Sequence, residues 1–217
     1  DPIDFGRLRF TVTGGRGPLG SDRYDSELTH IVTAAPQARP EGRGAVVTVP
    51  WARNERAASA GLKTTSYADN VIALAYAKER GAVEAICANE RGELCEAPGS
   101  NVFVVLDGEV STPPLDSGCL AGITRELVLE WCREDGLEVI EEALPLDVLT
   151  HADEVFLTSS IKDVFPVSSV DDRAFAAPGP VTAVYPVASS RLAIWVASRA
   201  PAAERARFSS RAVLSSA

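Results

Sequence analysis

An amine, an acid and a predicted helix start occur in a fixed order in the middle of the sequence. Lys63 comes first, Glu96 follows, and Gly122, Ile123 and Thr124 open a predicted helix. An unprotonated lysine can attack a carbonyl group and form a Schiff base. A carboxylate can pair with a basic ring nitrogen, and the free amides at a helix start can bind a phosphate. Together these groups would suit a phosphorylated cofactor with a carbonyl group and a nitrogen-containing ring.

Each of these groups also has an ordinary structural explanation. Taken alone, Lys63 would be a surface lysine, Glu96 an acid beside a turn, and Thr124 the N-terminal cap of its helix. The hydroxyl run 158–160 closes a predicted strand, where it suits either a phosphate or a simple turn. The order of the groups, rather than any one of them, favours the chemical interpretation.

The glycine-rich segment 14–20 does not have the pattern of a P-loop, since no Gly-Lys-Ser/Thr ending and no helix follow it. Arg16 and Arg23 could bind a substrate carboxylate through paired hydrogen bonds, and a surface role is the alternative for both. His30 and His151 are the only histidines and have no Cys or acidic residues at ligand spacing, so we expect no metal site.

The composition predicts one large domain, or one domain plus part of a second. The 217 residues are 46% hydrophobic, which allows a sizeable core, and the net charge of −9 argues against a general nucleic-acid binder. No apolar run is long enough to cross a membrane, and no signal peptide is visible. The four cysteines show no CxxC spacing, as is typical of reduced thiols, so we expect a cytoplasmic protein.

The two ends of the chain differ from its middle. The sequence contains no methionine, so we expect a fragment or a processed product. Residues 186–217 form an atypical basic tail, with a short helix predicted over 190–199. The segment 181–217 contains five arginines and one acid, a net charge of +4 that leaves −13 for the rest. Such a tail could bind an acidic partner, although a solvated extension is the simpler interpretation.

Strands interrupted by a few helices make up the predicted fold. Apolar patterns predict strands over 8–15, 28–36, 45–51, 83–89, 94–97, 101–112, 137–144, 153–160 and 163–172. Asp107 and Gly108 predict a hairpin turn within one of them. Helices are predicted over 67–80, 122–136 and 145–152. We expect the first helix to be capped near Asp69 and to have a stripe that includes Val71 and Leu74.

Because strands and helices do not alternate regularly, the pattern predicts an α+β fold. The stretch 36–44, which is rich in proline, glycine and charge, is the best linker candidate. We therefore expect three parts, which are the remainder of a small domain over 1–40, a large domain over 41–185 and the tail 186–217.

Four segments together resemble the class IV pyridoxal-phosphate (PLP) enzymes. They are GLKTTSYADNVIALA, NERGELCEAPGSNVFVVLDGEVSTPPL, GCLAGITRELVLEW and ADEVFLTSS. The family includes branched-chain and D-amino-acid aminotransferases and 4-amino-4-deoxychorismate lyase. The likeness runs over residues 45–183, and the opening LRFTVTGGRGPLGSDR is most similar to the lyase branch. It implies the fold of D-amino-acid aminotransferases, with a truncated small domain and a large, mixed-β, PLP-binding domain.

The resemblance implies a role for each candidate residue. Lys63 would form the Schiff base with PLP and move protons, and Glu96 would pair with the ring nitrogen. Leu120 would pack on the ring, and Tyr67 falls near the family's tyrosine beside the cofactor's phenolate oxygen. The phosphate would be bound by Ile123, Thr124 and Ser160.

The function implied by the resemblance is a lyase that converts 4-amino-4-deoxychorismate to 4-aminobenzoate and pyruvate, in folate synthesis. The alternatives are a class IV aminotransferase acting on branched-chain or D-amino acids, and an inactive, truncated remnant of the fold. Family members have a further segment before the small-domain strands, and they usually have glycine where this chain has Ala97. A homodimer that acts on a small-molecule substrate, without nucleic acid or membrane contact, is expected.

Overall fold

The chain divides into two compact units, with the boundary after Pro40. The computed structural model describes residues 3, 5–22, 25–38, 40 and 42–184. The helix predicted over 190–199 therefore lies outside the described residues, as does the tail from residue 186 onward. Within the described ranges, every helix is too short or too polar to cross a membrane.

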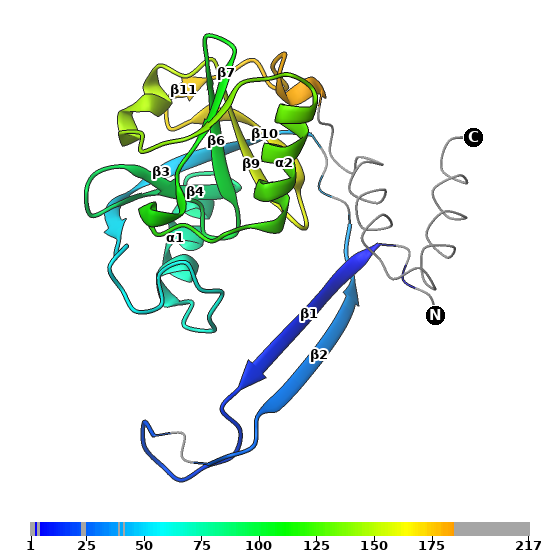
Figure 1. The fold of residues 1–217 in the computed structure, drawn as a ribbon, viewed down its shortest axis with the longest axis vertical. Coiled ribbons are helices and arrows are strands. Elements are labelled where there is room, and N and C mark those ends of the chain that lie inside the picture. The colour runs from blue at the N-terminus through cyan, green and yellow to red at the C-terminus, as the bar shows by residue number, and fades with distance from the viewer. Residues whose placement is uncertain (1–2, 4, 23–24, 39, 41, 185–217) are drawn as a thin grey trace. The chain divides into compact units, whose positions relative to one another are not determined.

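The first unit is a two-stranded antiparallel hairpin (Figure 1). Strand β1 (Gly6–Thr13) pairs with β2 (Thr29–Pro36) in a register that is continuous along both strands. Both strands that the sequence predicts for this part are confirmed. Large apolar side chains on these strands remain exposed, among them Phe10 and Val32. A two-stranded sheet lacks a second layer against which to bury such side chains.

The second unit is built on a curled nine-stranded sheet (Figure 1). Its strands are β3 (Gly44–Arg53), β4 (Glu84–Asn89), β5 (Leu94–Glu96), β6 (Asn101–Leu106), β7 (Glu109–Thr112), β8 (Val139–Glu141), β9 (Glu154–Ser159), β10 (Asp163–Val170) and β11 (Arg173–Ala174). They lie in the order β5-β4-β3-β10-β9-β6-β7-β8, with β11 paired to β10. Strand β3 is parallel to β4 and β10, β7 is parallel to β8, and the other pairs are antiparallel. This mixed sheet confirms the predicted α+β class.

Helices connect and cover the strands of this sheet. They are α1 (Ala68–Glu79), α2 (Ile123–Glu134) and the short 3-10 helices η1 (Leu115–Ser117), η2 (Leu146–Thr150) and η3 (Thr182–Val184). Helix α2 packs with Leu127 and Trp131 against Phe103 and Phe156 of the sheet. The two phenylalanine rings stack with their centroids 4.9 Å apart. Burying these large rings fixes the position of α2 on the sheet.

The buried face of α1 differs from the predicted stripe. Its N-terminal cap is Tyr67, two residues before Asp69, so the cap lies where the sequence predicts it. Val71 is 58% exposed, whereas Ala73 and Ala77 are buried against β3 and β4. Small alanine side chains let a helix approach a sheet closely, so size rather than hydrophobicity selects this face. The prediction of a stripe through Val71 is therefore wrong.

Strand β6 is buried on both faces, and this packing fixes the position of its first residue, Asn101. Val102 and Val104 point into one core cluster, and Phe103 points into the cluster under α2. Successive side chains of a strand point to opposite faces, so the continuous apolar run is a sign of double burial. Asn101, at the start of β6, is held by this packing.

Other sequence expectations are met with shifted boundaries. The hairpin turn at Asp107 and Gly108 is present, with φ angles of 50° and 85°. The strand predicted over 137–144 is shorter, since β8 covers only Val139–Glu141. The helix predicted over 145–152 is the 3-10 helix η2.

Candidate active site

Seven residues predicted to bind a cofactor line one cavity of about 470 Å³ in the second unit. They are Lys63, Tyr67, Glu96, Leu120, Ile123, Thr124 and Ser160. They come from the β3–α1 loop, the start of α1, strand β5, the start of α2 with the segment before it, and the turn after β9. The fold thus brings residues from five separate segments to one hollow.

The two arginines expected to bind a substrate carboxylate belong to a different part of the chain. Arg16 lies in the first unit, after β1, and Arg23 lies outside the described residues. Their role stays a prediction.

Glu96 presents a buried carboxylate with both oxygens engaged. Its Oε1 lies 3.1 Å from Nη1 of Arg53, and its Oε2 accepts a hydrogen bond of 2.9 Å from the Leu120 N–H. Burial raises the pKa of Glu96, while the charges of Arg53 and Lys63 and the Leu120 N–H oppose that rise. Lys63 therefore lies close enough to Glu96 for its charge to lower the pKa of that acid. A site that uses both groups needs them to be this close.

Lys63 lies in the exposed loop between β3 and α1. Most residues of the loop between β3 and α1 are exposed, and Lys63 is among them. Short backbone hydrogen bonds shape the loop, for example from the Leu62 N–H to the Ser59 carbonyl at 3.1 Å. The amine therefore lies on the wall of the cavity, open to solvent and to a reactant.

Tyr67 connects the start of α1 to the turn that follows Glu96. Its hydroxyl donates a hydrogen bond to the carbonyl oxygen of Pro98. Both residues line the cavity. This contact fixes the ring of Tyr67 along the wall of the cavity, while its role beside a cofactor oxygen stays a prediction.

The start of α2 is free to bind an anion. Gly122 is the N-terminal cap, with an extended backbone and no side-chain capping hydrogen bond in the described part of the chain. The alternative of Thr124 as the cap is therefore wrong. The first amides of a helix point outward and attract negative charge.

Asn101 holds the turn before α2 in place. Its Nδ2 donates a hydrogen bond of 2.8 Å to the Leu120 carbonyl. A Cβ atom on Gly122 would lie 2.1 Å from Oδ1 of Asn101, so this close approach requires glycine. The turn and the strand start thus form one fixed cradle beside the helix amides.

Thr158 adds an unsatisfied hydroxyl to the same cavity. Its Oγ1 is buried and has no hydrogen-bond partner among the described residues. Ser159 Oγ, by contrast, accepts a hydrogen bond from the Lys162 N–H. A buried polar atom without a partner calls for one, and phosphate oxygens would supply it. The residues present therefore fit a phosphorylated cofactor.

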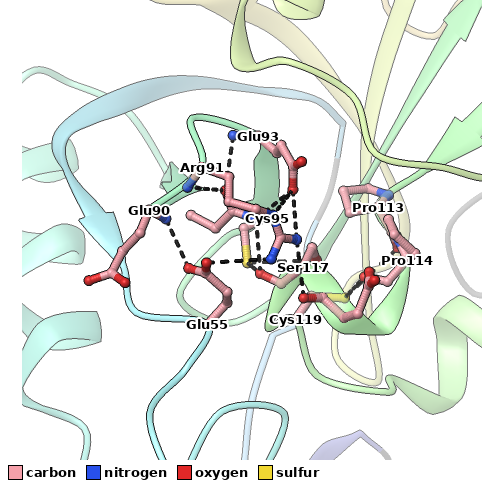
Figure 2. Close-up of polar contacts among 11 residues, drawn as sticks. Glu55, Glu90, Arg91, Glu93, Cys95, Pro113, Pro114, Ser117 and Cys119 are labelled. Carbon is pink, nitrogen blue, oxygen red and sulfur yellow. Dashed lines mark hydrogen bonds and ion pairs between the residues drawn. The ribbon is translucent and has the colours of Figure 1, made fainter.

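A polar cluster outside the lining of the cavity supports the segment that leads to Leu120 (Figure 2). Arg91 lies 3.4 Å from Glu55 and 2.7 Å from Glu93, and it donates a hydrogen bond of 3.2 Å to the Asp116 carbonyl. Glu55 lies at the start of the loop between β3 and α1, which contains Lys63. One arginine therefore ties that loop to the 3-10 helix η1.

The strand that contains Glu96 is tied to the same helix (Figure 2). Cys95 Sγ donates a hydrogen bond of 3.2 Å to the Ser117 carbonyl. Gly118 follows with φ of 91°, and a Cβ atom there would lie 2.8 Å from the Cβ of Glu55. These close contacts fix the distance between β5 and the segment that carries Leu120.

Glu84 ties together two other turns that line the cavity. Its carboxylate accepts hydrogen bonds from the Gly99 N–H at 3.0 Å and from the Ser100 hydroxyl at 3.3 Å. It also forms an ion pair with Lys162, which follows Ser160. Breaking such a buried pair by removing one partner is costly.

Sequence analysis assigns no role to two residues that shape the site, Arg53 and Asn101, although Asn101 lies within one of the segments that carry the family resemblance. Asn101 has a weak signal, since it is a polar residue at the start of an otherwise apolar strand. Arg53 has a similarly weak signal, since it is a charged residue at the end of a strand. Their partners are distant in sequence, so spacing alone cannot reveal the contacts.

The chain belongs to the amino-transferase class IV family, whose model matches residues 1–170. Enzymes of this class use PLP, and the fold is that of class IV PLP enzymes. Among curated relatives, the D-alanine aminotransferase of Bacillus licheniformis is 37% identical over 188 residues, which cover 82% of this chain and 64% of that protein.

Solved structures of the same fold come from two branches. The PLP form of the branched-chain aminotransferase from Thermobaculum terrenum has a TM-score of 0.76 and 28% identity, over 82% of this chain and 62% of that one. A protein assigned as a 4-amino-4-deoxychorismate lyase from Legionella pneumophila has a TM-score of 0.79 and 24% identity, over 83% and 67% of the chains. At that identity the second likeness shows the fold alone. The present chain spans less than two thirds of the length of both aminotransferases.

Proposed function

We propose that this chain is the cofactor-binding part of a PLP-dependent enzyme in which Lys63 forms a Schiff base with the cofactor. The observation that supports this proposal is the single cavity lined by Lys63, Glu96 and the free start of α2. These are the three groups that such a cofactor needs, and they come from separate segments of the chain.

In this proposal each residue has one task. Bound PLP supplies an electron-withdrawing ring that stabilises negative charge beside the substrate's amine nitrogen. Lys63 holds a proton at Nζ and moves it, while Glu96 keeps the ring nitrogen protonated. Leu120 packs against the ring, and Tyr67 lies beside its oxygen.

The phosphate belongs at the start of α2. The amides of Ile123 and Thr124 would donate hydrogen bonds to it, and Ser160 would add a hydroxyl. The unsatisfied Oγ1 of Thr158 is a further donor. Gly122 lets Asn101 approach the turn closely and so fixes the backbone beside these amides.

As the reaction, we propose the conversion of 4-amino-4-deoxychorismate to 4-aminobenzoate and pyruvate, in folate synthesis. Lys63 would move the proton that accompanies loss of the enolpyruvyl group and makes the substrate ring aromatic. The likeness of the opening segment LRFTVTGGRGPLGSDR to the lyase branch supports this choice. Arg16 and Arg23 would bind a substrate carboxylate.

Amino-group transfer is the second candidate, and its support is the 37% identity to a D-alanine aminotransferase. Lys63 would then move a proton from the substrate carbon that bears the amine to the cofactor carbon bonded to the same nitrogen. The matches to branched-chain aminotransferases extend this candidate to branched-chain amino acids.

The surroundings of the site also belong to the proposal. We assign residues 1–40 to a small domain, 41–185 to the PLP-binding domain and 186–217 to an additional tail. The apolar side chains that β1 and β2 expose support the proposal that another polypeptide segment packs on the hairpin. A cytoplasmic homodimer is the assembly that the family resemblance supports.

Addition of PLP to the purified protein tests this function. We expect a visible absorbance band that is lost in Lys63→Ala and kept in Lys78→Ala, a control lysine in the last turn of α1. Formation of 4-aminobenzoate and pyruvate would support the lyase, and a 2-oxo acid with a new amino acid would support the aminotransferase. A protein that gives no band with PLP would refute the proposal and favour an inactive remnant.

A further inference from the structure

Arg53 lies where it can reach the acid of the site. It is the last residue of β3, and Glu96 lies on β5, with β4 between them. Cys87 of β4 is the register partner of Glu96 and lines the same cavity. The guanidinium of Arg53 thus extends across one strand to meet Oε1 of Glu96 at 3.1 Å.

A second contact fixes the orientation of this guanidinium. Its Nη2 donates a hydrogen bond of 2.6 Å to Oδ1 of Asn70, in α1. The Arg53 side chain is only 24% exposed, and its Nε is buried without a hydrogen-bond partner in the described part of the chain. The sheet and the helix therefore hold Arg53 in one position, with one nitrogen directed at Glu96.

Arg53 is the cation in direct contact with Glu96. The titratable and charged groups that interact with that carboxylate are Arg53, Lys63, Cys87, Cys95 and Cys119, while Asp69 acts on Cys87. Lys63 is the other cation, but its amine is consumed when it forms a Schiff base. An arginine stays charged at any working pH, so its effect on Glu96 is permanent.

We propose that Arg53 is a positioning residue that keeps the Glu96 carboxylate charged and directed at the cofactor's ring nitrogen. The proposal rests on the PLP function proposed above. Glu96 and the ring nitrogen share one proton between them. With Arg53 in place the proton stays on the nitrogen, and without Arg53 it moves to the carboxyl group, which leaves a neutral ring that withdraws electrons less.

The first test compares binding of PLP with binding of its analogue in which carbon replaces the ring nitrogen. In Arg53→Met we expect the ratio of PLP affinity to analogue affinity to fall about tenfold, because only PLP uses the charged acid. Arg133→Met is the control, since Arg133 pairs with Glu141 on the surface and should leave the ratio unchanged. Equal losses for both compounds in Arg53→Met, or no loss for either, would overturn the proposal.

The second test needs no cofactor. The Glu96 carboxyl signal, assigned by its loss in Glu96→Gln, is followed by ¹³C NMR against pH in the cofactor-free protein. We expect the pKa of Glu96 to rise in Arg53→Met and to return most of the way in Arg53→Lys. An unchanged pKa in both variants would overturn the proposal.

The two tests distinguish a failure of the proposed role of Arg53 from a failure of the proposed PLP function. A wild-type protein that binds neither PLP nor its analogue would refute the proposed function, while the titration would still judge the pair of Arg53 and Glu96. A wild-type protein that binds PLP, with an Arg53→Met variant unchanged in both tests, would refute the inference alone. Arg53→Gln, which also removes the positive charge, serves as the working variant if Arg53→Met does not fold.

Discussion

Glu96 combines deep burial with two fixed partners, and its ionisation is therefore coupled to folding. Its side chain is 10% exposed and contacts Arg53 and the Leu120 N–H. Burial raises the pKa of Glu96 despite these partners. A raised pKa in an acid means that the native state holds the proton more tightly than the unfolded state does.

The pH dependence of stability should reflect this coupling. As pH rises above the ordinary Glu96 pKa of 4.5, the unfolded state releases the proton first, so the wild type loses stability relative to Glu96→Gln. Melting temperatures of both cofactor-free proteins across the acid range would measure the difference. A difference that grows in favour of the wild type with rising pH would contradict this account.

Among the secondary-structure elements, the turn before α2 requires a residue without a Cβ atom at Gly122. In Gly122→Ala the new Cβ would lie 2.1 Å from Oδ1 of Asn101, so the turn or the asparagine must move. We expect a loss of about 1–3 kcal/mol in the free energy of unfolding, together with weaker PLP binding.

Gly99→Ala is the matched control for this variant. Its Cβ would meet no atom closer than 3.4 Å, so its cost should be clearly smaller. Urea unfolding and equilibrium dialysis with PLP measure the two effects. Equal behaviour of the two variants would show that the cradle at Gly122 has no special importance.

The tie between two lining turns gives another prediction at this scale. Glu84→Gln leaves Lys162 without its ion-pair partner and weakens the contacts to Gly99 and Ser100, so unfolding should cost about 3 kcal/mol less. Lys162→Met should also be destabilising, because it leaves the buried Glu84 carboxylate without its cation and removes a contact with the Phe165 ring. Glu79→Gln, which affects an exposed pair, should change nothing measurable in urea unfolding. Similar losses in all three variants would contradict the tie.

Local pattern predicted the elements well and their contacts less well. Strands such as β6 and the helix α2 are clear in the sequence because apolar runs and end signals coincide there. The face of α1 was wrong because close packing selected Ala73 and Ala77 over the larger Val71.

The same distinction applies to the site. The ordered motifs and the family resemblance predicted the seven lining residues. The hydroxyl run 158–160 marks Thr158 in the sequence. The missing partner of its Oγ1 and the Arg53–Glu96 pair depend on contacts between distant segments, which no local pattern encodes.

At the scale of the whole molecule, the two units differ in how much they bury. The hairpin β1–β2 is mostly exposed, whereas β6 and β9 lie in a core covered on both faces. We therefore expect amides of β1 and β2 to exchange hydrogen through local opening, and amides of β6 and β9 only through global unfolding. Native-state hydrogen exchange measures this, and equal protection of both units would contradict it.

In the proposed enzyme, one lysine holds the cofactor. The chain contains three lysines, Lys63, Lys78 and Lys162, which makes a direct chemical test sharp. Borohydride reduction of the PLP-loaded protein, followed by peptide mass spectrometry, locates any Schiff base. We predict one reduced PLP group per chain, on Lys63. Attachment at Lys78 or Lys162 in its place, or no attachment at all, would contradict the account.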